Sequence, residues 1–272
     1  MTSIPEPIKR SKIRQLLGKE FYILRRHLDW KFGGKKWAQK DDGSFAGETV
    51  FEHRSTILRK LRDVDMQLQR NKRTNLELAI AHLDQMVIHR GETFSVWRNV
   101  GRPTKAKGYL DGLVLKQGQM ASGTGGGLCQ LGNLLFWLFA HSPLTVTERY
   151  RHGYDVFPDV NRTVPFGAGA TLSYNHIDLQ VLNDTIYDFK VELWLDEKYL
   201  HGRLLCECRL ENSYRVEERN HRIKQQFWGG YSRHNEIVRI ETDPEGNESE
   251  QLLVKNDAIM MYSPLLEDRT EG

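Results

Sequence analysis

Apolar residues recur every three or four positions in two stretches of the N-terminal third, which is the spacing of an amphipathic helix. The first stretch spans residues 8–30 and ends at Gly33-Gly34; the second begins at about Asn75 and ends before Arg90-Gly91. The first stripe consists of Ile13, Leu16, Leu17, Phe21, Leu24 and Leu28, and the second of Leu76, Ala79, Ile80, Leu83 and Val87. Residues 48–73 between them are charged and weakly periodic, so we expect at most a short helix near Ser55–Arg62.

The most apolar run of the chain, Leu131–Ala140, has apolar side chains on every face of a helix. This pattern predicts a fully buried helix of two to three turns. A glycine-rich turn, Gly123–Gln130, leads directly into the run. The glycines allow positive φ and a close approach of the backbone to a neighbour, and the turn leaves N–H groups unpaired at the start of the helix.

Short β patterns separated by turn residues dominate the chain from Glu92 onwards. Strands are predicted at Phe94–Val100, Leu113–Lys116, Thr145–Thr147 and Tyr154–Phe157, and hairpins at Ala170–Tyr174 with Ile177–Leu182, Phe189–Leu195 with Leu200–Leu210, and Glu236–Thr242 with Gln251–Lys255. Helices followed by antiparallel hairpins make an α+β fold, with N-terminal helices and a buried central helix entered by a glycine-rich turn. Residues 211–233 are the expected internal boundary, which divides the chain into a basic helical region (1–70), a core (71–210) and a C-terminal β-hairpin extension (211–272).

The positive charge of the chain is concentrated at its N-terminus. Residues 1–37 contain ten Lys and Arg against three acidic residues, a net charge of +7; the whole chain has +3, so the remainder has −4. A basic amphipathic helix either lies on an anionic membrane surface or packs on its own protein core with a solvated charged face. We favour packing on the core. Weak contact of residues 1–37 with anionic lipid is the alternative, and no aromatic-interleaved basic module predicts a nucleic-acid partner.

Three cysteines, Cys129, Cys206 and Cys208, cannot form a disulfide framework and favour a reducing compartment. No apolar run approaches the ~18–20 residues that span a bilayer, so we expect a cytoplasmic protein, peripheral at the membrane if the basic helix binds lipid. Cys206-Glu207-Cys208 with His201 lacks the usual four-ligand zinc pattern. We therefore predict no metal and no cofactor; the sequence leaves the oligomeric state undetermined.

Several motifs resemble the VanW-like family, named after a protein encoded in some vancomycin-resistance gene clusters. The matching segments are Gly91–Trp97, Gly108-Tyr109, Gly125–Gln130, Glu148–His152, Ala170-Thr171 with Asp178-Leu179, and Met260–Pro264. The resemblance covers roughly residues 70–264 and implies an association with glycopeptide resistance or the cell envelope, without supplying a reaction. Two positions depart from the family pattern: Gly169 stands where Asp is frequent, and Asn175 where Gly is frequent.

A thiol-dependent acyl transfer or amide hydrolysis is the mechanism that the residues suggest. Cys129 falls in the first turn of the buried helix, where the partial positive charge favours the nucleophilic thiolate. His152, in the Glu-Arg-x-x-His motif, would act as its base, and Asp178 on a later strand would orient the imidazole. This chain order is analogous to papain-like and transglutaminase-like enzymes. The structural alternative is that Cys129 is simply packed.

The predicted catalytic residues are thus Cys129, His152 and Asp178. The predicted substrate-binding residues are Gly125, Gly126, Gly127, Leu128, Gln130, Glu148, Arg149, Trp97 and Tyr109. A non-catalytic accessory protein is the second hypothesis, in which these residues bind an anionic or peptide-carboxylate group, such as a peptidoglycan-precursor-like ligand, and Cys129 has no chemical role.

Overall fold

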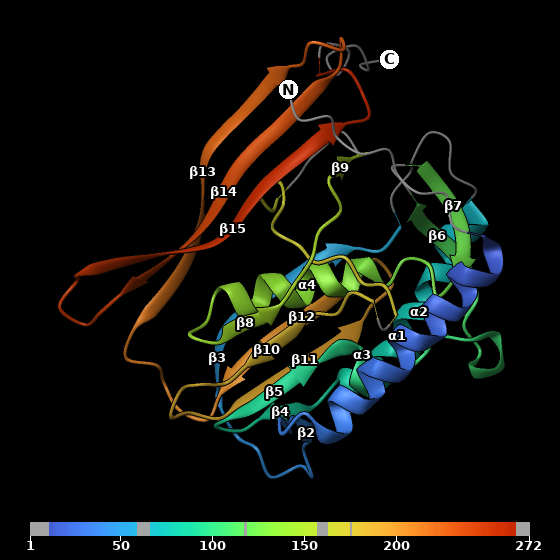
Figure 1. The fold of residues 1–272 in the computed structure, drawn as a ribbon. Helices are drawn as coiled ribbons and strands as arrows, with labels where there is room; N and C mark the ends of the chain where they lie inside the picture. The colour runs from blue at the N-terminus through green and yellow to red at the C-terminus, as the bar shows by residue number, and fades with distance from the viewer. Residues whose placement is uncertain (1–10, 59–65, 117–118, 157–162, 175, 265–272) are drawn as a thin grey trace. The chain divides into compact units, whose positions relative to one another are not determined.

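The computed structural model describes residues 11–58, 66–116, 119–156, 163–174 and 176–264, which form two compact units, Met1–Lys35 and Lys36–Gly272. Helices and mainly antiparallel sheets are both present (Figure 1), which confirms the predicted α+β fold. Each unit is described separately below.

In its described residues, 11–35, the first unit contains one helix, α1 (Lys12–Phe32), as its periodicity predicts. The Ser11 side chain accepts a hydrogen bond from the Arg14 N–H and caps the start, while the Gly33 N–H donates to the Asp29 carbonyl at the end. Ile13, Leu17 and Phe21 of its apolar stripe are exposed. Among the described residues, no helix is both long and apolar enough to cross a bilayer.

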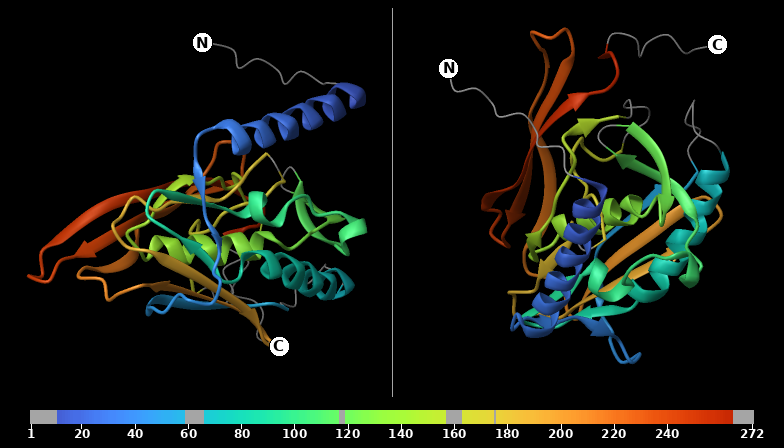
Figure 2. Two further views of the ribbon diagram at one scale, coloured as in Figure 1. Left: turned by 90° about the horizontal axis from the view of Figure 1, so that it is seen from below. Right: turned by 45° about the vertical axis from the view of Figure 1, so that its right-hand side comes forward.

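Two sheets and a central helix make the core of the second unit (Figure 2). Sheet A has the order β1-β5-β10-β8 and sheet B the order β2-β4-β11-β12-β3. The strands of sheet A are β1 (Lys36–Trp37), β5 (Glu92–Ser95), β10 (Gln180–Leu182) and β8 (Thr145–Glu148). Those of sheet B are β2 (Gln39–Lys40), β4 (Met86–Ile88), β11 (Phe189–Leu195), β12 (Tyr199–Cys206) and β3 (Glu48–Thr56). The β11–β12 pair confirms one predicted hairpin.

The central helix α4 (Cys129–Ala140) packs against β3 and β12, and every residue from Leu134 to Ala140 is buried. Gly202 of β12 permits the close approach, because a Cβ there would lie 2.8 Å from a methyl carbon of Leu138. A fully apolar helix is stable only when surrounded on all sides. The prediction of a buried central helix is confirmed.

Helix α2 (Met66–Leu83) starts nine residues before the predicted Asn75 and packs on the two-stranded sheet of β6 (Asp111–Lys116) and β7 (Gln119–Thr124) through β6. Two short helices lie between α2 and β6, namely α3 (Val96–Val100) and the 3-10 helix η1 (Lys105–Lys107). The side-chain amide of Asn75 joins α2 to the glycine turn, since it donates to the carbonyls of Leu110 and Gly126.

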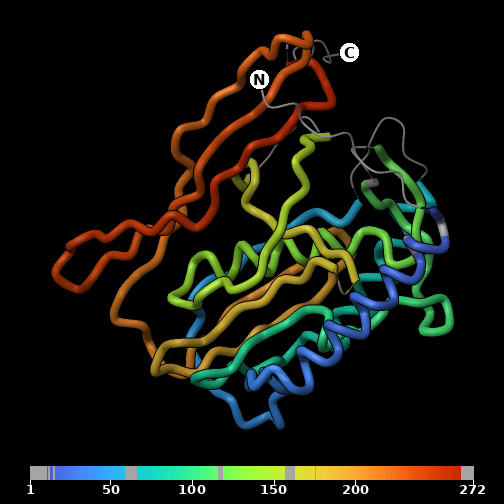
Figure 3. Tube along the Cα trace, viewed as in Figure 1, coloured from blue at the N-terminus to red at the C-terminus, as the bar shows by residue number. Residues whose placement is uncertain are grey.

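Sheet D has the order β13-β14-β15-β9 and extends away from the core sheets as a long, bent ribbon (Figure 3). Its strands are β13 (Ser213–Gln225), β14 (Tyr231–Thr242), β15 (Glu248–Met260) and β9 (Tyr154–Asp155). The predicted β14–β15 hairpin is confirmed, with strands longer than expected. Strand β13 occupies most of residues 211–233.

Of two local predictions, the first is tested only in part and the second is wrong. Residues from Ser55 form no helix in the described part, because Glu48–Thr56 is strand β3 at the edge of sheet B; residues 59–65 lie outside the description. Phe94–Val100 is not one strand, because Ser95 caps helix α3 at that point. Of the predicted hairpin around Asn175, the structure has a Ser173–Ile177 bridge and β10, and Asn175 itself lies outside the description.

Candidate functional site

The glycine turn before α4 is packed against other backbone and side chains of the protein. A Cβ on Gly126 would lie 2.1 Å from the Gly112 carbonyl carbon of β6, and one on Gly127 would lie 2.2 Å from the Lys72 side chain. Gly125 and Gly127 have φ of 77° and 95°, which only glycine adopts readily. Internal packing therefore accounts for all three glycines without a ligand.

Leu128 and Gln130 also serve the internal architecture. Leu128 is buried, and the Gln130 amide donates to the Ser55 hydroxyl at 2.8 Å and to the Thr56 carbonyl at 2.9 Å. These bonds tie the first turn of α4 to the end of β3. Both predicted binding residues thus have clear structural partners.

Cys129 has an exposed surface, and its thiol faces the Leu172 carbonyl oxygen at 3.8 Å. The protein packed around the sulfur raises the pKa of the thiol above its ordinary value, because the charged thiolate is poorly solvated there. This outweighs the effect expected from the helix start. No described residue with a basic side chain makes a hydrogen bond to the sulfur.

Asp178 is buried and holds the start of α3. Its carboxylate accepts hydrogen bonds from the Ser95 hydroxyl at 2.5 Å, the Trp97 N–H at 3.1 Å and the Leu179 N–H at 2.9 Å. Burial raises its pKa to about 6. In the described part of the chain its bonds go to these groups and Gln180, so they do not join it to His152.

Glu148 and Arg149 leave sheet A in different directions. The Glu148 carboxylate accepts from the Asp178 N–H at 3.1 Å. The Arg149 guanidinium donates to the Gly169 carbonyl at 2.8 Å and the Gly167 carbonyl at 2.6 Å, and it lies 5.0 Å from the Phe136 ring centre. Burial lowers the pKa of Arg149 to about 10, which still leaves the side chain cationic at neutral pH.

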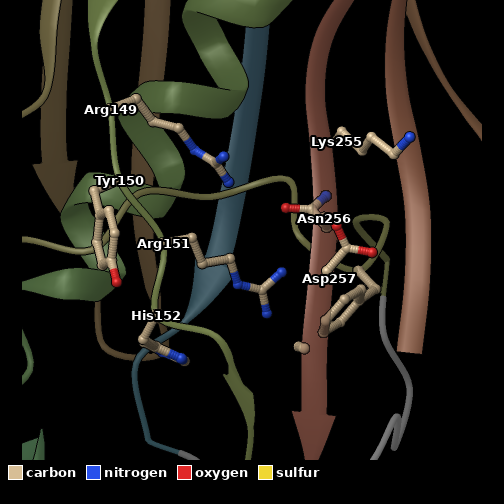
Figure 4. A pocket seen from close by; sticks show the side chains of 9 residues that line it. Arg149, Tyr150, Arg151, His152, Lys255, Asn256 and Asp257 are labelled. Carbon is tan, nitrogen blue, oxygen red and sulfur yellow. The ribbon is translucent and has the colours of Figure 1, made fainter. Parts of the chain in front are cut away.

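A cavity of about 210 Å³ lies between the 149–152 segment and β15 (Figure 4). The guanidinium groups of Arg149 and Arg151 and the His152 imidazole point toward β15. The cavity is lined by Arg149, Tyr150, Arg151, His152, Phe166, Lys255, Asn256, Asp257 and Ala258. Lys255 points away from the cavity and pairs with Glu236 at 3.7 Å, so the two guanidinium groups face the single lining carboxylate, Asp257, and the cavity is electropositive. Cys129 is not among the lining residues.

His152 lines this cavity and has a nitrogen without a hydrogen-bond partner. Its Nδ1 is enclosed and makes no hydrogen bond to any described residue. Burial, the largest cause, and the nearby Arg151 charge lower the pKa of the imidazole, so the ring is neutral at pH 7. Arg151 lies 4.2 Å from the Phe166 ring centre, which fixes its guanidinium within the cavity.

Trp97 and Tyr109 lie elsewhere. Trp97 is buried, donates from Nε1 to the Ile177 carbonyl at 2.8 Å and packs edge-on against Tyr174. Tyr109 is buried beside a different cavity, of about 310 Å³, and burial raises the pKa of its hydroxyl. Of the predicted site residues, only Arg149 and His152 meet in the electropositive cavity.

Comparison with known proteins gives the family. The model of the "VanW like protein" family matches residues 71–205, and "Vancomycin B-type resistance protein VanW" of Enterococcus faecalis is 36% identical over 186 residues, covering 68% of each chain. The chain belongs to the VanW-like family. "Uncharacterized protein YoaR" of Bacillus subtilis is 32% identical over 112 residues, which cover 40% of this chain and 34% of that protein. No solved structure matches.

The VanW-like motif residue at position 169 has a local explanation. A Cβ on Gly169 would lie 2.3 Å from the Asn133 side-chain oxygen of α4, and that oxygen accepts the Ala170 N–H at 3.0 Å. A side chain at 169 would have to displace the Asn133 amide from its bond to Ala170. In this chain, the glycine at 169 therefore leaves room for a side chain 36 positions earlier.

Sequence reasoning missed Arg151, Phe166 and the β15 residues Lys255–Ala258. Arg151 sits inside the recognised Glu148–His152 motif and could have been included as a second cation. The β15 residues gave no indication, because they lie more than a hundred positions away and reach the cavity only through the pairing of β15 with β9. Among the described residues, no group of three or more His, Cys, Asp or Glu is placed to hold a metal ion.

Proposed function

We propose that the protein is a binding protein that recognises an anionic group, such as a peptide carboxylate, in the cavity between Arg149–His152 and β15. The observation that carries this proposal is the convergence of two guanidinium groups and an imidazole on one small cavity. Planar guanidinium groups hold carboxylates through paired, charge-assisted hydrogen bonds.

The hydrogen-bonding state of the lining residues supports an anion. Arg149 uses Nε and Nη2 for the Gly169 and Gly167 carbonyls, which leaves its Nη1 without a bond to any described residue. The neutral His152 ring carries a single N–H, and its Nδ1 makes no hydrogen bond to a described residue, so the tautomer protonated at Nδ1 has a donor for an anion. The single acidic lining residue, Asp257, is engaged by His234 at 2.5 Å, so its repulsion of an anion is reduced.

The size of the cavity favours a small ligand group, such as the terminal residue of a peptide, rather than a bulky ligand. Sites for drug-sized molecules measure roughly 300–1,000 Å³, whereas this cavity measures about 210 Å³. A terminal carboxylate with one small side chain suits that volume. The vancomycin-resistance name of one relative connects the proposal with envelope peptides, whose carboxyl termini carry the required charge.

The test is calorimetric titration with a short acylated peptide ending in D-alanine, with the same peptide as its C-terminal amide for comparison. We expect the acid to bind and the amide to bind at least about tenfold more weakly, because loss of a charge-assisted pair costs about 1.5–3 kcal/mol. Arg151→Gln should weaken binding of the acid by about the same factor.

Arg90→Gln is the matched control, because Arg90 is exposed and does not line the cavity. It should leave the affinity unchanged. Equal binding of acid and amide, or full affinity in Arg151→Gln, would reject carboxylate recognition in this cavity.

A Cys129 thiol enzyme is the second candidate, favoured by the accessibility of Cys129 at the start of α4. It requires a base, and His152 would have to reach the sulfur. Mass spectrometry of the protein incubated with the same acylated peptides tests it: a covalent adduct on Cys129, absent from Cys129→Ser and His152→Gln, supports the enzyme. Peptide binding without adduct or turnover supports the binding protein.

A further inference from the structure

The turn between β13 and β14 displays two large aromatic side chains to solvent. Phe227 is 96% exposed and Trp228 is 53% exposed, and their rings pack edge-on with centres 5.0 Å apart. Ile259 and Met261 at the same end of sheet D are also exposed. Burying aromatic side chains is strongly favourable, so their display at a turn points to an occupant.

Charge identifies the kind of occupant. Residues 220–235 contain Arg222, Lys224 and Arg233 and no acidic residue. Arg222 and Lys224 are exposed, whereas Arg233 is buried and pairs with Asp155 at 3.5 Å. The aromatic turn is therefore flanked by two solvent-facing cations with no carboxylate in the same segment.

The opposite end of sheet D has the opposite sign. Residues 236–250 contain six acidic residues and one basic residue, Arg239, a net charge of −5. Arg215 and Arg219 of β13 pair with two of the acids, Glu248 and Glu250, so this end remains acidic. In Figure 1 the β14–β15 turn lies at the left of the view and the β13–β14 turn at the top, so the sheet separates its basic aromatic end from its acidic end. Only the basic end is attracted to an anionic surface.

The aromatic turn is held in shape from within. The Gln226 N–H donates to the Gly230 carbonyl at 2.8 Å, and the Gln226 amide bonds the Ser232 hydroxyl, which pairs with His234 Nε2 at 2.7 Å. Gly229 has φ of 87°. A turn fixed in this way loses little entropy when its aromatic tip enters another phase.

We propose that the β13–β14 turn is a membrane-interface anchor that inserts Phe227 and Trp228 among the headgroups of an anionic lipid surface. Trp is enriched at the level of the headgroups because its ring is apolar while its N–H is polar. Arg222 and Lys224 then lie near the lipid phosphates. None of these four residues lines the anion cavity.

The test is vesicle flotation of the full chain with phosphatidylcholine vesicles with and without about one-third phosphatidylglycerol. Phe227→Ser with Trp228→Ser should lower the partition coefficient for anionic vesicles about tenfold, since most of two exposed aromatic side chains would no longer enter the interface. Lys224→Gln, which removes one charge, should lower it about fivefold and weaken its salt dependence. Leu252→Ser is the control, because Leu252 is 57% exposed on β15 away from the turn.

Brominated lipids make the test specific for the turn, because α1 could also hold the chain on vesicles. Bromine quenches indole fluorescence at close range, and α1 carries an indole of its own, Trp30, so the measurement is made in a Trp30→Phe background. There Trp228→Phe should remove the quenched component while binding persists. Unchanged quenching in Trp228→Phe overturns the proposal. An unchanged partition coefficient in Phe227→Ser with Trp228→Ser also overturns it. If that variant instead loses self-association in size-exclusion chromatography, the turn contacts a second copy of the chain and not a membrane.

Discussion

The glycine turn at Gly125–Gln130 and the cationic segment at Glu148–His152 both carry the family resemblance, yet they differ in how their groups are used. In the turn, Gly126 touches Gly112, Gly127 touches Lys72 and the Gln130 amide is bound to β3. In the cationic segment, His152 keeps an unbonded nitrogen beside an open cavity. A motif whose sequence suggests a catalytic or binding role can therefore serve only internal packing. Unsatisfied polar groups indicate a binding site more directly than glycine residues do.

The largest expected effect comes from adding one methyl group to the glycine turn, which tests whether the turn is packed. Gly126→Ala should lower the free energy of unfolding by about 3 kcal/mol, because its Cβ would meet the Gly112 backbone, which cannot rotate away as a side chain can. Urea denaturation followed by circular dichroism measures this.

Gly18→Ala is the matched control for that measurement. No atom lies within 4 Å of the Cβ position of Gly18 in α1, so alanine there should be neutral or stabilise the helix by up to about 1 kcal/mol. A loss below about 1 kcal/mol in Gly126→Ala would mean that the turn is not packed as described and is free to hold a ligand.

A change at Arg149 tests the comparison further, because this side chain both makes internal hydrogen bonds and lines the cavity. Arg149→Lys should cost about 2 kcal/mol of unfolding free energy, since one ammonium group cannot reproduce the two directed bonds to Gly167 and Gly169. Thermal unfolding of this variant beside exposed Arg90→Lys, expected to change by less than about 0.5 kcal/mol, gives the measurement. A loss no greater than that of Arg90→Lys would show that the two carbonyl bonds contribute nothing to stability.

The local sequence pattern correctly predicted those elements whose environment is uniform along their length. From Leu134 to Ala140, helix α4 is apolar and buried on every face, and the β11–β12 hairpin has a polar turn between two apolar strands. Strand β3 was missed because it lies at the edge of sheet B, where charged Glu48 and Glu52 remain solvated and hide the β pattern. Helix α3 was missed because its start is fixed by Asp178, 81 residues from Trp97.

Only the part of the site that lies within one local motif could be predicted from the sequence. Arg149 and His152 are near neighbours in one motif, so a local reading includes both. Lys255, Asn256 and Asp257 complete the cavity through sheet pairing over a long sequence separation, which no local period encodes. The proposed role of Asp178 followed from chain order alone, whereas its actual bonds follow from the pairing of β10 with β5.

The smallest expected effect concerns Cys129, which is accessible but lies outside the electropositive cavity. Its only side-chain hydrogen bond in the described structure is a long one to the Leu172 carbonyl at 3.8 Å. Cys129→Ser should therefore change the unfolding free energy by less than about 1 kcal/mol and leave peptide-carboxylate binding unchanged.

Alkylation by iodoacetamide sharpens this further, because only the thiolate reacts. Poor solvation raises the pKa of the Cys129 thiol above its ordinary value of 9.0, so the thiolate fraction at pH 7 is lower than that of an unperturbed cysteine and is still rising above pH 9. The labelling rate at Cys129, followed by peptide mass spectrometry, should be slow at pH 7 and should not reach a plateau by pH 9. Rapid labelling at pH 7 would instead require a charged partner that stabilises the thiolate. It would favour a functional site at the start of α4 over one at the cationic segment.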